Sequence, residues 1–164
     1  MKQIISTNRI ELRFPEQYMA NDIFLLISEN RLELNIFLPW VKYIYHVNDI
    51  EDMISAYQQL FSDNKEYRFY IFENIENKVI GSITLRNIDI LSKQAELGFW
   101  LDKSHIGNGY ITEAFYAISN EAKNIEHIVA KTKVNNYKCI KTLKNLGFKI
   151  SEESKSYILF TKHL

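Results

Sequence analysis

The strongest constraint on this chain is a strand joined to a helix by a turn that holds two glycines. The strand runs from Glu96 to Leu101, the turn contains Gly107-Asn108-Gly109, and apolar residues at helical spacing begin at Ile111. Two glycines separated by one residue let the backbone turn sharply while its N–H groups point inward, and the helix N-terminus adds partial positive charge. This strand-turn-helix segment therefore predicts a binding site for an anionic cofactor. The alternative is an ordinary turn that begins a helix.

Length and charge limit the classes of protein to consider. The chain has 164 residues, enough for a buried core, and we expect residues 1–164 to form a single domain. Twenty basic and twenty acidic residues cancel. Because sequence-independent binding to nucleic acid or to an anionic membrane needs a positive excess, we expect neither as a direct partner.

Cys139 is the only cysteine. A single thiol excludes an internal disulfide and a zinc site with several thiolates, and it fits a reducing compartment. The first nine residues lack the long apolar core of a signal peptide, and no apolar run approaches the length of a membrane span. The sequence thus predicts a cytoplasmic location.

Hydrophobic periodicity predicts an α/β chain. Alternation of apolar and polar residues, or enrichment in β-branched and aromatic residues, predicts strands at 10–14, 67–72, 78–85, 96–101, 128–133, 148–150 and 157–161. The turn-prone residues 74–77 join two of these strands as a hairpin. An antiparallel meander followed by a β-α-β crossover predicts a mixed sheet with helices on both faces.

Helix boundaries can also be assigned from the sequence. Asn48, with Glu51 three residues later, is expected to cap a helix that continues to Phe61. Asn136 is expected to cap a short helix that carries Cys139 and ends at Gly147. These two helices and the one that follows the glycine turn are the clearest in the chain.

Four segments together resemble a known family. They are Asn35-Ile36-Phe37-Leu38-Pro39-Trp40-Val41, Ala95-Glu96-Leu97-Gly98-Phe99-Trp100-Leu101, the turn Gly107-Asn108-Gly109-Tyr110 with Thr112-Glu113-Ala114, and Asn136-Tyr137-Lys138-Cys139 running to Leu146-Gly147-Phe148. In this order and spacing they resemble the GNAT superfamily of acyl-CoA-dependent N-acetyltransferases, and within it the bacterial ribosomal-protein N-terminal acetyltransferases of the RimJ/RimL type. The resemblance covers nearly the whole chain.

The resemblance implies a GNAT-like fold and acetyl-CoA as cofactor. The fold would be a single-domain mixed sheet of about six or seven strands, mostly antiparallel, in which the strands at 96–101 and 128–133 splay apart. The amide-bearing pantetheine arm would pair with the exposed strand edge, and a bulge near Gly98 would produce the divergence. The implied cofactor-binding residues are Phe99, Trp100, Leu101, Ile106, Gly107, Asn108, Gly109, Tyr110, Ile111, Thr112 and Asn136.

The chain departs from the family pattern at three positions. Ile106 stands where the phosphate turn usually begins with Gln or Arg, and Ile111 stands where the turn usually ends with Gly or Ala. Loss of the polar first side chain removes one hydrogen bond to phosphate, on the order of 1–3 kcal/mol, while the main-chain donors remain. Cys139 stands where this branch commonly has Ser.

Acetyl transfer to an amine needs a base for the amine, a site for the oxyanion and a proton for the leaving thiolate. Main-chain N–H groups around Phe99 are expected to contact the oxyanion. Glu96 is the best candidate base, with a plain solvent-facing carboxylate as the alternative. Cys139 takes the proton-donor role by resemblance, with a buried packing residue as the alternative. No metal ligand is expected among these residues.

The sequence indicates less clearly which residues would bind the acceptor amine. Trp40 and Glu96 are expected to contact the acceptor, although a lone Trp is usually a core residue. His105 lies next to the phosphate turn and is either a phosphate contact or an exposed loop residue.

We expect an N-acetyltransferase that acts on a primary amine. The amine is either a protein N-terminus or a small amine such as a polyamine or an antibiotic. The carboxylates Glu29, Glu33, Glu51 and Asp52 would attract a cationic acceptor if they converge. A non-catalytic acyl-CoA-binding module is the alternative from another class, and the chain is expected to be a monomer or a homodimer.

Overall fold

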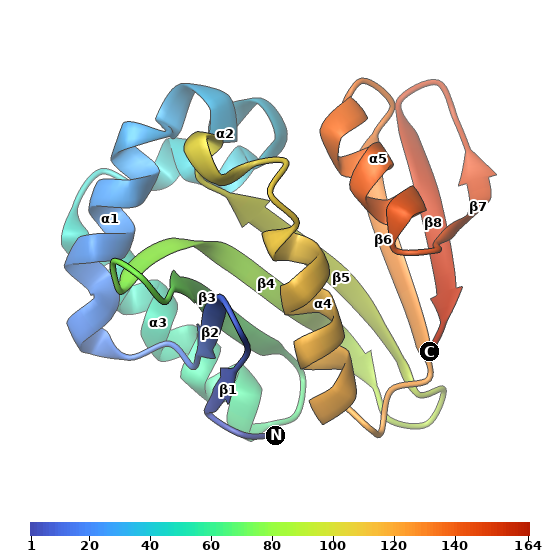
Figure 1. Ribbon diagram of the computed structural model, residues 1–164, viewed down its shortest axis with the longest axis horizontal. Coiled ribbons are helices and arrows are strands. Elements are labelled where there is room, and N and C mark those ends of the chain that lie inside the picture. The colour runs from blue at the N-terminus through green and yellow to red at the C-terminus, as the bar shows by residue number, and fades with distance from the viewer.

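The computed structural model describes residues 1–164 and contains one eight-stranded sheet (Figure 1). The strands are β1 (Ile4–Ser6), β2 (Ile10–Arg13), β3 (Tyr67–Glu73), β4 (Lys78–Asp89), β5 (Gln94–Leu101), β6 (His127–Lys133), β7 (Lys149–Glu153) and β8 (Tyr157–His163). The expectation of six or seven strands was too low. The additional strand is β1, which is too short to show a recognisable alternation of its own.

The helices are α1 (Ala20–Glu29), α2 (Arg31–Phe37), α3 (Val47–Ser62), α4 (Tyr110–Glu121) and α5 (Tyr137–Asn145). Short 3₁₀ segments lie at Gln17–Met19, Pro39–Tyr43 and Lys103–His105. None of the helices combines the length and the apolar composition that crossing a membrane requires.

The strand order across the sheet is β1-β2-β3-β4-β5-β6-β8-β7. Every neighbouring pair is antiparallel except β5 and β6, which are parallel and are joined through α4. The mixed, mostly antiparallel sheet predicted from the order of elements is thereby confirmed, as is the hairpin between β3 and β4.

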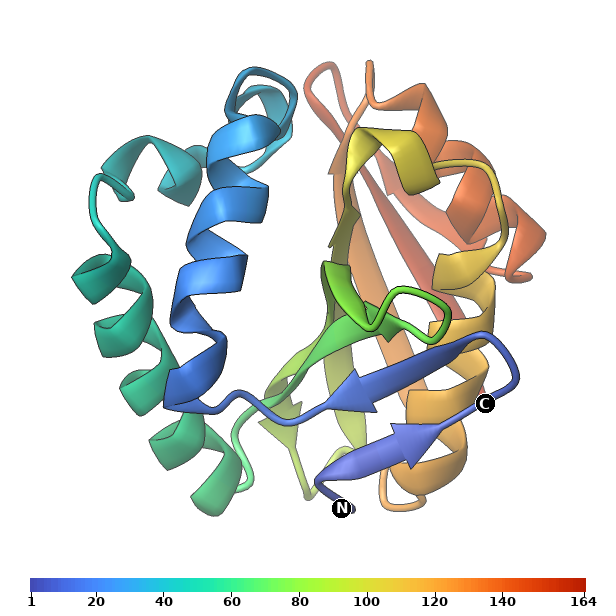
Figure 2. The same ribbon diagram turned by 60° about the vertical axis from the view of Figure 1, so that its left-hand side comes forward.

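Helices cover both faces of the sheet, as predicted, and each face has its own core (Figure 2). The larger cluster lies under α4 and α5 and includes Phe69, Phe115 and Phe160, all fully buried. The smaller cluster lies under α1, α2 and α3 and includes Tyr70 and Trp100 from the sheet. The sheet therefore separates two hydrophobic layers.

The helix ends confirm some predicted caps and correct one. The Asn136 side chain accepts a hydrogen bond from the Cys139 N–H at 3.3 Å, and Gly147 follows α5 with φ of 81°. Asn48, however, does not cap α3. The cap residue is His46, whose N–H donates to Asp49 Oδ2 at 2.8 Å, so the helix begins two residues earlier than the Asn48 pattern indicated.

The C-terminal hairpin differs from the prediction in its connection. Strand β7 continues to Glu153, and only residues 154–156 separate it from β8. The strands predicted at 148–150 and 157–161 leave residues 151–156 as the connection between them. Its first half pairs with β8 instead, through a register irregularity between Ile150 and Glu152.

Two glycines in β4 and β5 give a matched test of the sheet. A Cβ at Gly81 would lie 2.2 Å from the Trp100 carbonyl oxygen, whereas a Cβ at Gly98 would meet nothing within 4 Å. We expect Gly81→Ala to lower the free energy of unfolding by about 1–3 kcal/mol because the main chain must shift. Gly98→Ala should leave thermal stability unchanged. Equal melting temperatures for the two variants would contradict the close approach at Gly81.

Candidate active site

The turn before α4 has the main-chain geometry of an anion site. Gly107 has φ of 89° and Gly109, the cap residue of α4, has φ of 81°. None of the N–H groups from Ile106 to Thr112 donates a hydrogen bond to an acceptor of the protein. These donors, with the helix N-terminus behind them, fit a pyrophosphate without a basic side chain on the turn itself.

The two isoleucines that depart from the family pattern occupy different environments. Ile111 is buried and belongs to the larger core, so it anchors the first turn of α4 to the sheet. Ile106 is 39% exposed at the start of the turn. The apolar residue at 111 is therefore explained by packing, and the one at 106 leaves the turn open to solvent.

The turn is braced by a residue that the sequence did not reveal. Arg9, in the connection between β1 and β2, donates from Nε to Glu113 Oε2 at 2.7 Å and from Nη1 to the Asn108 carbonyl at 2.9 Å. Its guanidinium also lies 4.7 Å from the centre of the Tyr110 ring. Arg9 thus ties the turn and the first turn of α4 to the N-terminal hairpin.

Glu113 is the centre of this brace. Its Oε1 accepts from Thr7 Oγ1 at 2.5 Å and from the Arg9 N–H at 3.0 Å. Partial burial acts to raise the pKa of Glu113, but the hydrogen bonds from Thr7 and Arg9 outweigh it and hold the pKa below its usual range. The carboxylate therefore stays ionised at neutral pH, and it also lies favourably at a helix N-terminus.

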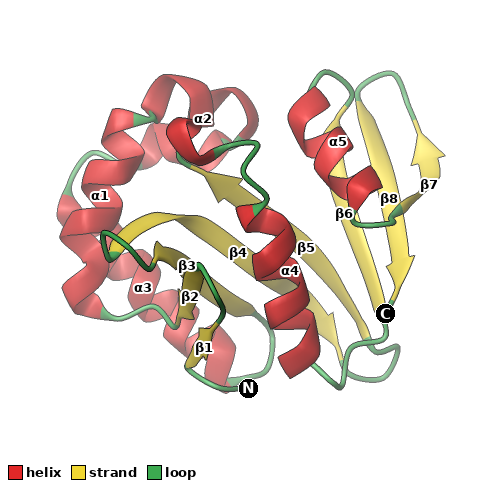
Figure 3. Cartoon of the chain, in the orientation of Figure 1, coloured by secondary structure: helices red, strands yellow, loops and turns green.

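Strands β5 and β6 are paired only at their first residues. The parallel register joins Gln94 to His127, Ala95 to Ile128 and Glu96 to Val129, and it ends there (Figure 3). Beyond this point the edge of β5 from Leu97 to Leu101 has no partner on the β6 side. A ligand that carries amide groups can pair with this edge as an added strand.

The divergence does not arise from a bulge at Gly98. The β4–β5 register is continuous from Gly81 opposite Leu101 to Arg86 opposite Glu96, so no bulge lies at Gly98 itself. The register irregularity of this pair lies on β4 between Arg86 and Asp89, opposite Gln94 and Glu96. Phe99 and Leu101 are half-buried and pack against the larger core. Trp100 points the other way and is buried in the smaller core, which leaves its main chain, not its side chain, on the open edge.

A small hollow of about 50 Å³ adjoins β5 on the side of α1–α3. Leu38, Trp40 and Trp100 form its apolar wall, and the two indole rings lie 6.4 Å apart. Trp40 therefore lies on the wall of this hollow, and its contact with an acceptor stays a prediction. The polar part of the wall includes the side chains of Arg68 and Arg86.

The four carboxylates that were considered for a cationic acceptor do not converge on this hollow. Glu29, Glu33, Glu51 and Asp52 are all absent from its wall. Glu33 lies 3.4 Å from Lys103 Nζ instead.

Glu96 lies on the same face of β5 as Gly98, but it is not an isolated carboxylate. Its Oε1 accepts from Arg86 Nη2 at 2.5 Å, and its Oε2 accepts from Asn87 Nδ2 at 2.9 Å. The side chain is 22% exposed. Glu96 is therefore neither a plain solvent-facing carboxylate nor free of partners, because β4 supplies both hydrogen-bond donors.

Cys139 is half-buried in α5 and packs against the larger core. Burial raises the pKa of its thiol, while a hydrogen bond with the Thr132 side chain on β6 acts in the opposite direction. The thiol thus remains protonated at neutral pH. Asn136 is committed to capping α5 through the Cys139 N–H.

His105 belongs to a local network that precedes the phosphate turn. Its Nδ1 lies 2.7 Å from Asp102 Oδ2, and Ser104 Oγ hydrogen-bonds to the same carboxylate oxygen. Burial acts to raise the pKa of Asp102, but hydrogen bonds from Ser104 and His105 prevail and lower it. His105 is therefore held by its own loop, with a partly exposed ring.

Comparison with known proteins gives a consistent result. Residues 9–149 match the family described as the acetyltransferase (GNAT) domain. A ribosomal-protein-serine acetyltransferase from Escherichia coli (strain K12) is 28% identical over 130 residues, which is 77% of this chain and 72% of that protein.

Solved structures agree in fold. The RimL ribosomal L7/L12 alpha-N-protein acetyltransferase in complex with coenzyme A has a TM-score of 0.90 at 19% identity, covering 98% of each chain. The microcin C7 self-immunity acetyltransferase MccE, in complex with acetyl-CoA and AMP, has a TM-score of 0.89 at 22% identity, covering 96% of this chain and 94% of that one.

The brace at the turn can be tested by binding. We expect Arg9→Met to weaken the affinity for coenzyme A by about tenfold, because the turn loses one anchoring hydrogen bond and a nearby positive charge. Isothermal titration calorimetry measures this. Arg13→Met is the matched control, since Arg13 lies on β2 and pairs with Glu11 away from the turn. Equal affinities in the two variants would contradict the brace.

Proposed function

Because this chain belongs to the GNAT family of acetyltransferases, which transfer the acetyl group of acetyl-CoA, we propose that its acceptor is the α-amino group of a protein N-terminus. The Escherichia coli relative acts on a ribosomal-protein serine, as its name states. A ribosomal protein is therefore the first acceptor to consider for this chain.

The observation that carries the proposal is the charge of the hollow beside Gly98. Arg68 and Arg86 line it, and no carboxylate does. Each arginine is ion-paired, Arg68 with Glu66 and Arg86 with Glu96, and neither carboxylate is among the residues that line the hollow. This arrangement disfavours a polycationic small amine. A peptide N-terminus brings one amine and neutral amide groups, which this wall tolerates.

The cofactor would be held mainly by main-chain groups. The N–H groups of residues 106–112 fit the pyrophosphate, and the unpaired edge of β5 at residues 99–101 fits the pantetheine arm. Asn136, at the N-terminus of α5, is a further candidate contact. When bound, acetyl-CoA supplies the acetyl group and a thiolate leaving group.

The reaction also needs a stabilised oxyanion and two proton transfers. Main-chain N–H groups of β5 near Phe99 are the candidate oxyanion donors. Cys139 is the candidate proton donor to the thiolate, since its raised pKa keeps the proton on Sγ at neutral pH. Glu96 is the candidate base, acting through water while Arg86 and Asn87 hold its carboxylate in place.

The role of Cys139 can be separated from packing by two substitutions. If Cys139 donates a proton, Cys139→Ala should lower kcat by about 10²-fold or more, and Cys139→Ser should retain most of it because a hydroxyl also donates. The KM for acetyl-CoA should change little in either variant. If both variants keep the wild-type kcat and lose only thermal stability, Cys139 is a packing residue.

The pH dependence of kcat gives an independent readout. Because burial raises the pKa of the thiol, the fall in kcat at alkaline pH should begin above the ordinary cysteine value of about 8.5. In Cys139→Ser this alkaline fall should disappear, since serine does not titrate in the range. An unchanged alkaline limb in that variant would assign it to another group.

The acceptor is tested with matched amines. Mass spectrometry follows acetylation of a short peptide that begins with serine, the same peptide with a formylated N-terminus, and spermidine. We expect only the peptide with the free α-amine to be acetylated at an appreciable rate, and Glu96→Gln to slow that reaction without abolishing binding of coenzyme A. Faster acetylation of spermidine would overturn the proposal.

A further inference from the structure

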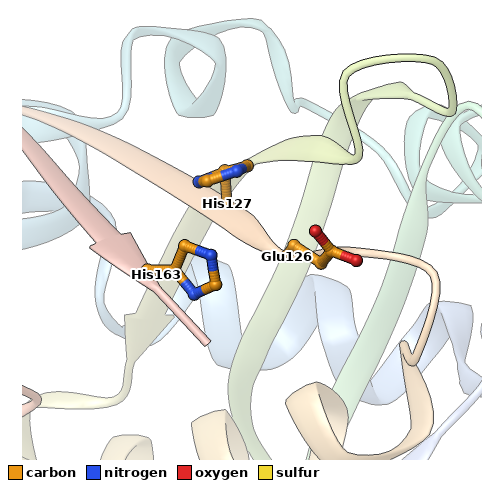
Figure 4. Close-up of side chains that lie close together, drawn as sticks. All are labelled: Glu126, His127 and His163. Carbon is orange, nitrogen blue, oxygen red and sulfur yellow. The ribbon is translucent and has the colours of Figure 1, made fainter.

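A cluster of metal-binding side chains lies at the opposite end of β6 from the divergence. His127 begins β6, His163 ends β8, and the two are directly opposite each other in the antiparallel register. Glu126 immediately precedes β6. Figure 4 shows the three side chains gathered at this end of the strand pair. We propose that Glu126, His127 and His163 form a surface site for one divalent transition-metal ion of the Zn²⁺ class.

The distances allow three ligands to meet. One ligand atom from each residue lies within 4.8 Å of the others, and the two imidazole rings are 4.6 Å apart at an interplanar angle of 87°. Around a tetrahedral Zn²⁺ with bonds of about 2.0–2.1 Å, ligand atoms are separated by about 3.4 Å. Both histidines are exposed, so small side-chain rotations close the remaining distance without moving the strands.

Hydrogen bonding selects the nitrogen that His163 offers. Its Nδ1 lies 2.9 Å from the main-chain oxygen of Leu164, which can only accept. Nδ1 therefore carries the proton, and Nε2 keeps its lone pair for a metal. In histidines that bind metals, the other ring nitrogen usually donates to an oxygen of the protein, which fixes the tautomer.

The main chain under the three ligands is fixed at several points. The Leu164 N–H donates to the Glu126 carbonyl at 2.9 Å, and the N–H groups of Glu126 and His127 donate to the Lys93 carbonyl at 2.8 and 3.0 Å. The first bond holds the end of β8 to the start of β6, and the other two hold the start of β6 to the residue that precedes β5. The ligand set is consequently pre-organised by the sheet and does not depend on a flexible loop.

The chemistry of the ligands indicates the class of ion. Two imidazoles and one carboxylate suit Zn²⁺, Ni²⁺ or Cu²⁺, whereas Mg²⁺ and Ca²⁺ require oxygen ligands. With three protein ligands, a fourth position remains for water from the adjoining hollow of about 440 Å³, which His127 and His163 help to line.

Lys93 competes with the metal for Glu126. Its Nζ lies 2.5 Å from Glu126 Oε1. In Figure 4 the Glu126 carboxylate is turned away from the two imidazole rings, so it must rotate away from Lys93 to join them around a metal ion. Because both side chains are about half exposed, the ion pair is weak and a divalent cation can displace the ammonium.

Calorimetry on the full chain tests the site. After treatment with EDTA, titration with ZnCl₂ in a non-chelating buffer should show one ion per chain, and MgCl₂ should give no heat. Loss of an outer-shell partner alone costs about 10–100-fold in metal affinity, so His127→Ala and His163→Ala should each cost at least that much. Lys93→Met should tighten binding by about two- to fivefold, the size expected on releasing one exposed ion pair.

Two control variants test whether Zn²⁺ binding is specific to this cluster. Cys139→Ser and His105→Ala remove the other plausible zinc ligands, and both should bind as the wild type does. Circular dichroism melts establish that each variant is folded. Absence of Zn²⁺ binding to the wild type, or binding that survives in the double variant His127→Ala/His163→Ala, would overturn the proposal.

Discussion

The structure depends on how early β5 and β6 separate. Only three residue pairs join these two parallel strands, yet β6 is paired with β8 along its whole length and β5 with β4. Each diverging strand therefore keeps one satisfied edge and exposes the other. Unpaired main-chain N–H and C=O groups at a sheet edge cost free energy when they are buried. They can form hydrogen bonds with any extended chain that carries amide groups. The proposed recognition of acetyl-CoA by main-chain groups of β5 depends on this one departure from regular pairing.

The second requirement is a rigid anion turn, and the N-terminal hairpin provides it. Arg9 and Thr7 reach Glu113 across about a hundred residues of sequence, and the contact also involves the Asn108 carbonyl. Glycines at φ near 80–90° are entropically expensive in an unbraced loop. The brace restricts the turn before the ligand arrives, which reduces the ordering cost of binding.

Local patterns predicted most of the fold and the placement of the turn, because periodicity and capping act within a few residues. Asn136, Gly147 and the β3–β4 hairpin were identified in this way. The hydrogen-bond partners of Glu96 were not identified from local patterns, because they depend on the register of β4 against β5. The role of Arg9 was missed because it contacts residues about a hundred positions away in the sequence. Strand β1 was missed because three residues are too few to show an alternation of apolar and polar side chains. The bulge at Gly98, inferred from family resemblance, proved unnecessary to the divergence. The roles of Cys139 and Trp40 stay predictions.

The two hydrophobic clusters have an evolutionary consequence. The larger one supports α4, α5 and hence the turn that carries the anion-binding N–H groups, while the smaller one supports Trp40, Trp100 and the wall on the far side of the sheet. Because the sheet lies between most of the two clusters, we expect substitutions in the smaller cluster to change selectivity for the incoming amine more than affinity for the nucleotide-linked donor. A lineage built on this scaffold can diversify its targets while retaining a common acyl source.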